Sequence, residues 1–84
     1  MINKKITKFS RQSCGPCVAF AAAWKELKEE NPEIEFVEVD TGTEGGKKEA
    51  QDLGIRKIPY YVNQDGAKIV GETTKEAFQQ ILLK

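Results

Sequence analysis

The residues best suited to chemistry in this chain are its two cysteines, Cys14 and Cys17, which enclose Gly15 and Pro16. Thiols at this spacing can cycle between a dithiol and an intramolecular disulfide, so the pair predicts redox activity. A bridge closing so short a loop would stabilise the fold by only about 2 kcal/mol in the chain-entropy model, which makes a purely structural bridge the weaker interpretation. Zinc normally takes four ligands, so a zinc site would have to be shared between two chains. We expect no metal site.

The dithiol lies between a predicted strand and a predicted helix. Residues 5–9 predict a short strand that ends at Ser10. Apolar residues at helical spacing follow the dithiol and predict one helix to about Glu30, where Asn31 and Pro32 stop it. Its apolar positions are Cys17, Phe20, Ala21, Trp24 and Leu27.

This position predicts different roles for the two cysteines. Cys14 lies where the helix begins, among backbone N–H groups without partners and at the positive end of the helix dipole, a setting that stabilises a thiolate. Cys17 lies one turn further on, on the apolar side, and we expect it to be buried and less reactive. Gly15 gives the turn conformational latitude, and Pro16 suits the first helical turn because its missing N–H costs nothing there.

The rest of the chain predicts a small α/β fold. Residues 34–39 predict a second strand, and Thr41 and Glu44 predict a capped helix over 44–53, with Ala50 and Leu53 as its apolar side. Residues 58–62 and 67–70 predict two strands joined by a hairpin turn over 63–66. Residues 73–76 cap a last helix, whose core positions are Ala77, Phe78, Ile81 and Leu82.

The order strand–helix–strand–helix–strand–strand–helix predicts one topology. The first two strands should be parallel through a right-handed crossover, and the last two should be antiparallel. We therefore expect a four-stranded mixed sheet with helices on both faces. At 84 residues, positions 1–84 form a single domain.

Composition restricts the possible partners. Thirteen basic and thirteen acidic residues give a net charge of zero, so we expect neither nucleic acid nor an anionic membrane as a partner. No stretch approaches the roughly 20 apolar residues of a membrane span, and the first residues do not resemble a signal peptide. We expect a monomer in the cytoplasm, where a CxxC pair is more often redox-active or metal-binding than a permanent bridge. The absence of histidine excludes Cys–His hydrolytic catalysis.

Three stretches resemble the thioredoxin family. The first is the dithiol, Cys14-Gly15-Pro16-Cys17, the variant typical of thioredoxins. The second, Gly54-Ile55-Arg56-Lys57-Ile58-Pro59, is similar to the family segment that ends in a cis-proline facing the dithiol. The third is Val70-Gly71, followed by a capped last helix. The resemblance covers nearly the whole chain from Lys5 onward.

The resemblance implies a thioredoxin-like fold and the reduction of protein disulfides by dithiol exchange. Cys14 would be the nucleophile, Cys17 the resolving thiol, and the Cys14–Cys17 bridge the redox-active disulfide, with no bound cofactor. Partners would be disulfide-containing client proteins and an electron donor similar to thioredoxin reductase. The implied groove binds an extended client segment beside Cys14. Its residues would be Ser13, Ile58, Pro59, Val70 and Gly71, with a cis bond before Pro59.

The chain also departs from the family pattern. We expect no counterpart of the strand and helix that open a full-length thioredoxin. Ser13 stands where the family usually has tryptophan, and Ala22 stands where a proline usually kinks the active-site helix. Lys57 replaces a residue that is normally small. These departures leave the chemistry in place but bear on rate, redox potential and partner choice.

The most informative departure is Lys8, which stands where thioredoxins carry a buried aspartate that assists proton transfer from the second cysteine. Because a buried ammonium is costly, we expect its stem to be buried and its head to reach water or an acidic partner. A positive charge there would lower the pKa of the thiols, stabilise the reduced form and raise the reduction potential. In the alternative, Lys8 points to solvent from an open sheet face.

Two other functions remain open. A glutaredoxin would take its electrons from glutathione, and the chain's size fits that class. Glutaredoxins, however, usually have a proline and an aromatic residue between the cysteines and a Gly-Gly pair after the last strand, and Val70-Gly71-Glu72-Thr73 shows no such pair. A thioredoxin-like binding module would use the groove without turnover, and retention of both cysteines argues against it.

Overall fold

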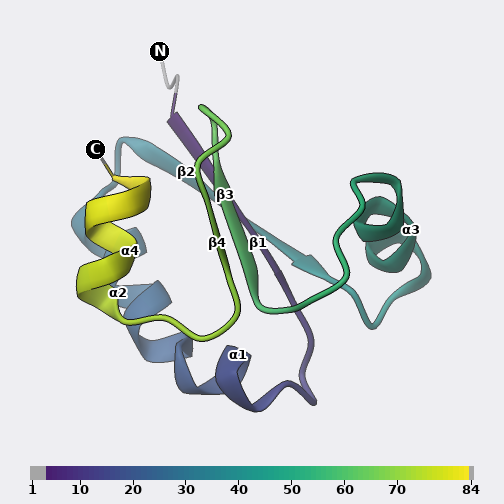
Figure 1. The fold of residues 1–84 in the computed structure, drawn as a ribbon. Helices are drawn as coiled ribbons and strands as arrows, with labels where there is room; N and C mark the ends of the chain where they lie inside the picture. The colour runs from purple at the N-terminus through teal and green to yellow at the C-terminus, as the bar shows by residue number, and fades with distance from the viewer. Residues whose placement is uncertain (1–3, 84) are drawn as a thin grey trace.

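The chain folds around a four-stranded mixed sheet, in a computed structural model that describes residues 4–83 (Figure 1). The strands are β1 (Lys4–Ser10), β2 (Ile34–Asp40), β3 (Tyr60–Asn63) and β4 (Lys68–Val70). Their order across the sheet is β2-β1-β3-β4. Strand β1 is parallel to β2, whereas the β1–β3 and β3–β4 pairs are antiparallel. The predicted mixed sheet is confirmed.

Helices lie on both faces of this sheet. The short α1 (Gly15–Ala19) leads into α2 (Ala21–Glu30), which lies with α4 (Lys75–Leu82) on one face, and α3 (Glu44–Asp52) lies on the other (Figure 1). The main core forms where α2 and α4 meet the sheet. It consists of Ile6, Phe20, Trp24, Leu27, Ile34, Tyr61, Ile69, Phe78 and Leu82. Because burying each large apolar side chain stabilises a fold by about 1.5–3 kcal/mol, this face holds the domain together.

The helix predicted to follow the dithiol is divided in two, because the chain bends at Phe20. The Phe20 N–H still bonds to the carbonyl of Pro16 at 3.2 Å, but Phe20 itself belongs to neither helix. Its ring is buried against Tyr61 and Phe78, with centroids 5.3 and 5.6 Å away. Ala21, the first residue of α2, is exposed. The prediction that Ala21 faces the core is therefore wrong.

Helix α3 is capped by Thr43 and not, as predicted, by Thr41. The Thr43 hydroxyl oxygen accepts a hydrogen bond from Gly46 N–H at 3.0 Å. Thr41 instead donates its hydroxyl to the last carbonyl of β1 at 3.2 Å, because it still runs beside that strand. Ala50 is buried as predicted. Leu53 is 63% exposed, because it lies beyond the last helical residue, and its predicted place on the apolar side is wrong.

Strand β3 begins at Tyr60, two residues later than the predicted strand. The Ile58-Pro59 bond is cis, as the family resemblance implied. Pro59 has no N–H to donate to a sheet, so pairing begins at Tyr60, which lies opposite Phe9 of β1. The strand ends one residue later than predicted, at Asn63.

The predicted hairpin turn over residues 63–66 is confirmed. The Asn63 side-chain oxygen accepts hydrogen bonds from the N–H groups of Asp65 and Ala67, at 2.9 and 3.0 Å. Its amide nitrogen donates to the carbonyl of Leu82 at 3.1 Å, which ties the hairpin to the end of α4. Gly66 has a φ of +85°, a conformation that favours glycine. The buried Asn63 therefore fixes both the turn and its position against the last helix.

Helix α4 is capped by Thr74, whose hydroxyl accepts a hydrogen bond from Ala77 N–H at 3.1 Å. Phe78 and Leu82 are buried, as predicted, and Ala77 is partly buried. Ile81 is 47% exposed. Phe78 and Leu82, one turn apart, define the face that packs on the core, and Ile81 lies at its margin. Its predicted place in the core is therefore wrong.

Within residues 4–83, no helix is both long and apolar enough to cross a membrane. The same residues contain no group of three or more cysteine and carboxylate side chains placed to hold a metal ion.

Candidate active site

The dithiol occupies the turn between β1 and α1, and the two sulfurs form a disulfide. Cys14 is the N-cap of α1, and its Sγ accepts a hydrogen bond from Cys17 N–H at 3.2 Å. The two Cα atoms are 5.2 Å apart, within the usual range for a bridge. Pro16 lies in the first turn of the helix, as predicted. The backbone geometry of a helix start therefore brings the two sulfurs together.

The two cysteines differ in their access to solvent. Cys17 is 6% exposed, whereas Cys14 is only partly buried. Ser13 and Gly15, the chain neighbours of Cys14, are both exposed. A sulfur atom on another protein can therefore approach Cys14 more easily than Cys17. The predicted burial of Cys17 is confirmed.

The segments predicted to form a groove lie at the dithiol end of the sheet. The carbonyl of Pro59 accepts a hydrogen bond from Gly71 N–H at 2.7 Å, and Tyr60 pairs with Val70, so the two segments are joined. Pro59 is fully buried, Ile58 is partly exposed and Val70 is 47% exposed. Figure 1 shows the chain before β3 and after β4 at the same end of the molecule as the start of α1.

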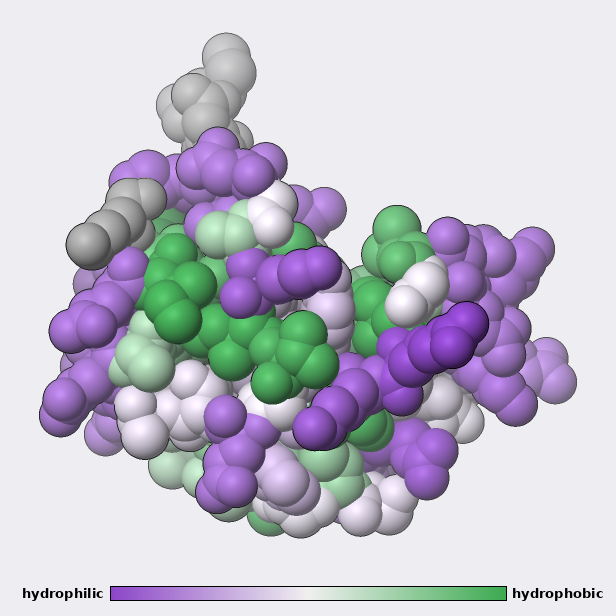
Figure 2. All heavy atoms as spheres, viewed as in Figure 1, coloured by the Kyte–Doolittle hydropathy of each residue, from purple (hydrophilic) through white to green (hydrophobic). Residues whose placement is uncertain are grey.

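The surface beside these segments combines apolar and cationic character. Figure 2 shows apolar side chains gathered over β4 and toward α4, bordered by hydrophilic ones. Val70 is one of the exposed large apolar residues. The stem of Lys57 lies over Gly71, since a Cβ atom at Gly71 would lie 3.6 Å from Lys57 Cε. Lys57 therefore brings a positive charge to one side of the groove.

Lys8 is buried on the sheet face that α2 covers, so the alternative in which it points to solvent is wrong. The residue is 7% exposed, and its Nζ lies 3.2 Å from Glu38 Oε1 and 4.6 Å from the centroid of the Trp24 ring. The strand register places Glu38 beside Lys8 on β2 and Tyr61 beside it on β3. The expected arrangement, a buried stem with its ammonium on an acidic partner, is confirmed.

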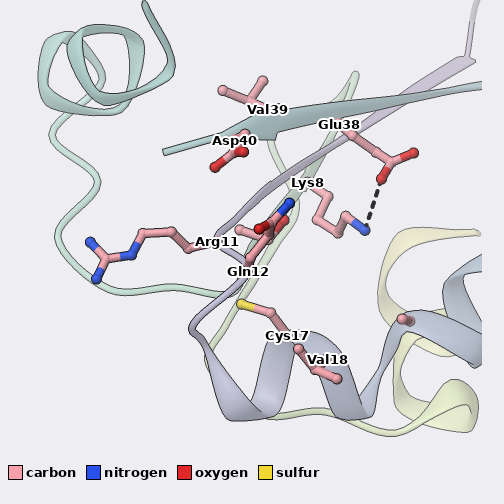
Figure 3. A pocket seen from close by; sticks show the side chains of 10 residues that line it. Lys8, Arg11, Gln12, Cys17, Val18, Glu38, Val39 and Asp40 are labelled. Carbon is pink, nitrogen blue, oxygen red and sulfur yellow. Dashed lines mark ion pairs between the residues drawn. The ribbon is translucent and has the colours of Figure 1, made fainter. Parts of the chain in front are cut away.

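An open pocket of about 330 Å³ joins this ion pair to the buried cysteine (Figure 3). Lys8, Glu38 and Asp40 line it from the sheet, Arg11 lines it from the loop after β1, and Cys17 lines it from α1. Figure 3 shows the Cys17 sulfur pointing from α1 toward the loop that carries Arg11 and Gln12, and the Lys8–Glu38 pair on the other side of the pocket. The pocket therefore places two ionisable side chains and a thiol around one space open to solvent.

Tyr61 contributes no charge to these surroundings at neutral pH. It is fully buried, and burial raises its pKa to about 12. Among residues 4–83, neither its hydroxyl nor Trp24 Nε1 has a hydrogen-bond partner. Glu38, Trp24 and Tyr61 surround Lys8. Glu38 is therefore the side chain that balances the positive charge of Lys8.

Sequence reasoning missed Glu38 and Asp40 as neighbours of the dithiol. A partial signal was present, because side chains alternate along a strand and residues 34, 36, 38 and 40 of β2 must share a face. The pairing of Lys8 with Glu38 also needs the register of the β1–β2 pair, which the sequence pattern does not supply.

Comparisons with known proteins agree with this geometry. The sequence model described as Thioredoxin matches residues 2–84. The chain is 37% identical over 71 residues to the chloroplastic F-type thioredoxin of Mesembryanthemum crystallinum, an alignment that covers 84% of this chain and 37% of that protein. The alignment with the F-type thioredoxin of Spinacia oleracea also covers 37% of that protein. The chain thus spans little more than a third of the length of the curated relatives it matches.

Solved structures extend the agreement to the fold. Fasciola hepatica thioredoxin superposes with a TM-score of 0.79 at 27% identity, covering 93% of this chain and 77% of that chain. Oxidised thioredoxin O2 of Arabidopsis thaliana gives a TM-score of 0.79 at 23% identity, a likeness of fold alone. A family sequence model that matches nearly every residue, and a dithiol set at the start of a helix beside a cis-proline, together establish that this chain belongs to the thioredoxin family.

Proposed function

We propose that this chain is a thiol–disulfide oxidoreductase that reduces disulfides in client proteins. Cys14 acts as the nucleophile and Cys17 as the resolving thiol. One observation carries the proposal: the Cys14–Cys17 bridge joins an accessible sulfur at a helix start to a buried one, in a chain of the thioredoxin family.

The reaction proceeds in two exchanges. The Cys14 thiolate attacks one sulfur of the client disulfide, and the bond between the two client sulfurs breaks. Cys17 N–H, which donates to Cys14 Sγ, stabilises that thiolate. The Cys17 thiolate then attacks Cys14 Sγ, closes the Cys14–Cys17 bridge and releases the second client sulfur. Two electrons pass from the dithiol to the client, and each client sulfur gains a proton.

The client segment is proposed to lie across the exposed end of the sheet. Ser13 precedes the nucleophile, Ile58 and Val70 supply partly exposed apolar side chains beside it, and the buried Pro59 and Gly71 form the backbone beneath them. The exposed Val70 and the hydrogen bond between Pro59 and Gly71 support this assignment, since they place an apolar side chain on a backbone that is joined across the two segments. An extended client backbone would run along this surface, with its disulfide over Cys14.

Regenerating the dithiol requires two electrons, and we propose that they come from a flavoprotein of the thioredoxin reductase kind. The deciding experiment measures reduction of a protein disulfide with two donors, NADPH with a thioredoxin reductase and glutathione with its own reductase. Turnover with the first donor supports the proposal. Turnover with glutathione alone would identify a glutaredoxin. Binding of the client without turnover from either donor would identify a binding module.

We also propose that the protein acts as a monomer in the cytoplasm. The two cysteines of the chain are bonded to each other, so neither is left to link two copies through a disulfide. The F-type relatives are chloroplastic, and that location describes those proteins. Sedimentation at micromolar concentration tests the monomer, and fractionation of source cells tests the location.

A further inference from the structure

We infer that an open pocket between α3 and the segment before Pro59, which we call the α3 pocket, holds a carboxylate of the peptide whose sulfur Cys14 attacks. The pocket thereby selects among the molecules that the dithiol reduces. This inference rests on the proposed function and deepens it, because it assigns substrate selectivity to a set of basic residues outside the dithiol and outside the groove.

Three basic side chains line the α3 pocket, which has a volume of about 380 Å³. They are Lys47 of α3, Arg56 of the segment between α3 and β3, and Arg11 of the loop after β1. All three residues are exposed, and Figure 2 shows hydrophilic side chains between the sheet and α3. Figure 3 shows the Arg11 side chain extending away from Cys17. Among residues 4–83, the other residues that line the pocket carry no charge. The lining is therefore purely cationic, which attracts an anion.

None of the three basic side chains forms an ion pair within the part of the chain that the structure describes, where the ion pairs are made by Lys8 and Lys75. Asp40 lies near the stem of Arg11, since a Cβ atom at Gly42 would be 3.0 Å from Asp40 Oδ1 and 3.5 Å from Arg11 Cγ. That oxygen accepts a hydrogen bond from Gly42 N–H at 2.8 Å, and Asp40 does not line the α3 pocket. An anionic ligand therefore has no internal carboxylate to displace.

The rest of the lining is largely apolar, and its backbone is fixed. Ala50 is 6% exposed, and Ile55 and Ile58 are partly exposed. Ile55 N–H donates a hydrogen bond to the carbonyl of Ala50 at 2.8 Å, which ties the segment that carries Arg56 to the end of α3. Apolar walls with a few charged groups are typical of sites that bind and orient a small ligand. The methylene groups of an acidic residue can pack on these walls while its carboxylate meets the cations.

The α3 pocket is lined from both segments that border the groove beside Cys14. On one side, the carbonyl of Arg11 accepts a hydrogen bond from Cys14 N–H at 3.1 Å, and Arg11 Nε donates to Ser13 Oγ at 3.3 Å. On the other side, Ile58 lines the pocket and directly precedes the buried Pro59. A peptide that crosses the groove with its sulfur at Cys14 therefore brings its neighbouring residues to the pocket.

A carboxylate is the anion that best fits this group of cations. A guanidinium group donates two parallel N–H bonds to the two oxygens of a carboxylate, and an ammonium adds a third donor. By the proposed function, the molecule reduced at Cys14 is a peptide, and carboxylates are the anions that an unmodified peptide carries. The carboxylate has two possible sources, an acidic side chain of a client protein or a free carboxylate of a small peptide thiol such as glutathione. Both sources present the same chemical group to the pocket.

The test uses peptides whose cysteine is joined through a disulfide to an uncharged aromatic thiol that absorbs light once released. The Cys14 thiolate attacks the peptide sulfur, the bond between the two substrate sulfurs breaks, and its electron pair leaves on the aromatic sulfur, which is the better leaving group. In the first series, glutamate or glutamine is placed in turn at each position that flanks the peptide's cysteine. In the second series, the peptide is glutathione, with its carboxylates free or esterified. The reduced full chain is mixed with each substrate, and the second-order rate constant of release is measured.

At low ionic strength, we expect the acidic substrate to react about three- to tenfold faster than its neutral counterpart in at least one series. Lys47→Gln and Arg56→Gln should each lower this preference by about half or more. The control is Lys48→Gln, which changes the net charge equally, lies exposed on the same helix and does not line the pocket, so it should leave the preference unchanged. Added salt should weaken the preference of the wild type, because the cations are exposed.

The two series distinguish the sources of the carboxylate. A preference in the first series alone identifies client side chains, a preference in the second alone identifies a small peptide thiol, and a preference in both shows that the pocket accepts either. Arg11 stays unchanged in these variants, because it also lines the pocket that contains Cys17. The rates with neutral substrates reveal any separate effect of a variant on the fold or on the dithiol.

Equal rates for acidic and neutral substrates in both series overturn the inference. A preference that survives in Lys47→Gln and Arg56→Gln also overturns it, and would assign selectivity to another cation such as Lys57 beside Gly71. A preference that Lys48→Gln lowers equally would assign it to net charge and overturns the inference as well. If the wild-type protein releases the aromatic thiol from no substrate at all, the proposed function fails, which is a separate and distinguishable result.

Discussion

The two sulfurs of the dithiol differ in exposure and in position, so we expect them to differ in reactivity. At pH 7, iodoacetamide should alkylate Cys14 in the reduced protein at least about tenfold faster than Cys17, because a helix start and a donated N–H both favour its thiolate. Peptide mapping by mass spectrometry measures the two rates. Cys17→Ser should accumulate stable mixed disulfides with clients, and Cys14→Ser should not. Equal labelling of both thiols would contradict the assigned roles.

The buried Tyr61 leads to a second prediction, which concerns the stability of the fold at alkaline pH. Its pKa is raised to about 12 in the folded protein, against about 10 in an unfolded chain. The folded state therefore holds a proton that the unfolded state loses, and stability should fall as pH rises from 10 to 12. Tyr61→Phe should remove this loss, which amounts to about 1.4 kcal/mol at pH 11. Urea unfolding at pH 7 and pH 11 measures it.

The control for that experiment is Tyr60→Phe, the neighbouring position, which is only partly buried. At pH 7, Tyr61→Phe should be at least as stable as wild type, because no described residue bonds to the Tyr61 hydroxyl. A pH dependence in Tyr61→Phe as steep as in the wild type would show that this hydroxyl does not couple to folding.

Residues whose roles follow from local spacing could be predicted from the sequence. Cys14, Cys17 and Pro16 belong to one helix start, and helix-start rules place them whatever the rest of the chain does. Lys8 could not be placed, because its environment depends on the register of β1 with β2 and on the helix that covers it. The Lys8–Glu38 pair joins residues 30 positions apart on two strands (the register pairs Lys8 with Glu38), and no local rule connects them.

At the scale of the elements, the approach of α3 to β2 depends on a single glycine. A Cβ atom at Gly46 would overlap the carbonyl oxygen of Asp40, whereas one at Gly45 would meet nothing within 4 Å. Gly46→Ala should therefore destabilise the fold by about 1–3 kcal/mol, because the helix must move away from the strand. Gly45→Ala should stabilise it by about 0.5–1 kcal/mol through helix propensity. Urea unfolding of the two variants measures both values, and equal effects would show that the close approach is not required.

Element types could be predicted from periodicity and turn residues, but several boundaries could not. The helix after the dithiol divides at Phe20 because its ring packs on Tyr61 and Phe78, which are distant in sequence. Helix α3 takes Thr43 as its cap because Thr41 is engaged by β1. Both differences arise where a tertiary contact competes with a local preference.

At the scale of the whole molecule, the core rather than the disulfide holds the fold. Nine buried residues, from Ile6 to Leu82, form one cluster between the sheet and helices α2 and α4. The Cys14–Cys17 loop is so short that closing it contributes only about 2 kcal/mol in the chain-entropy model. The proposed redox cycle requires a chain that stays folded with the disulfide formed and with it reduced, and a fold held by its core meets that requirement.

The last prediction compares these two contributions directly. Reduction of the disulfide should lower the free energy of unfolding by no more than about 2 kcal/mol and leave the protein folded. Phe78→Ala, which empties the centre of the core, should cost about 3–5 kcal/mol in either redox state. Trp24, the single tryptophan, is 4% exposed in that core, so its fluorescence reports urea unfolding with and without reductant. If the reduced protein unfolds without denaturant, the bridge and not the core supports the fold, and the cycle proposed for the dithiol would have no stable reduced state.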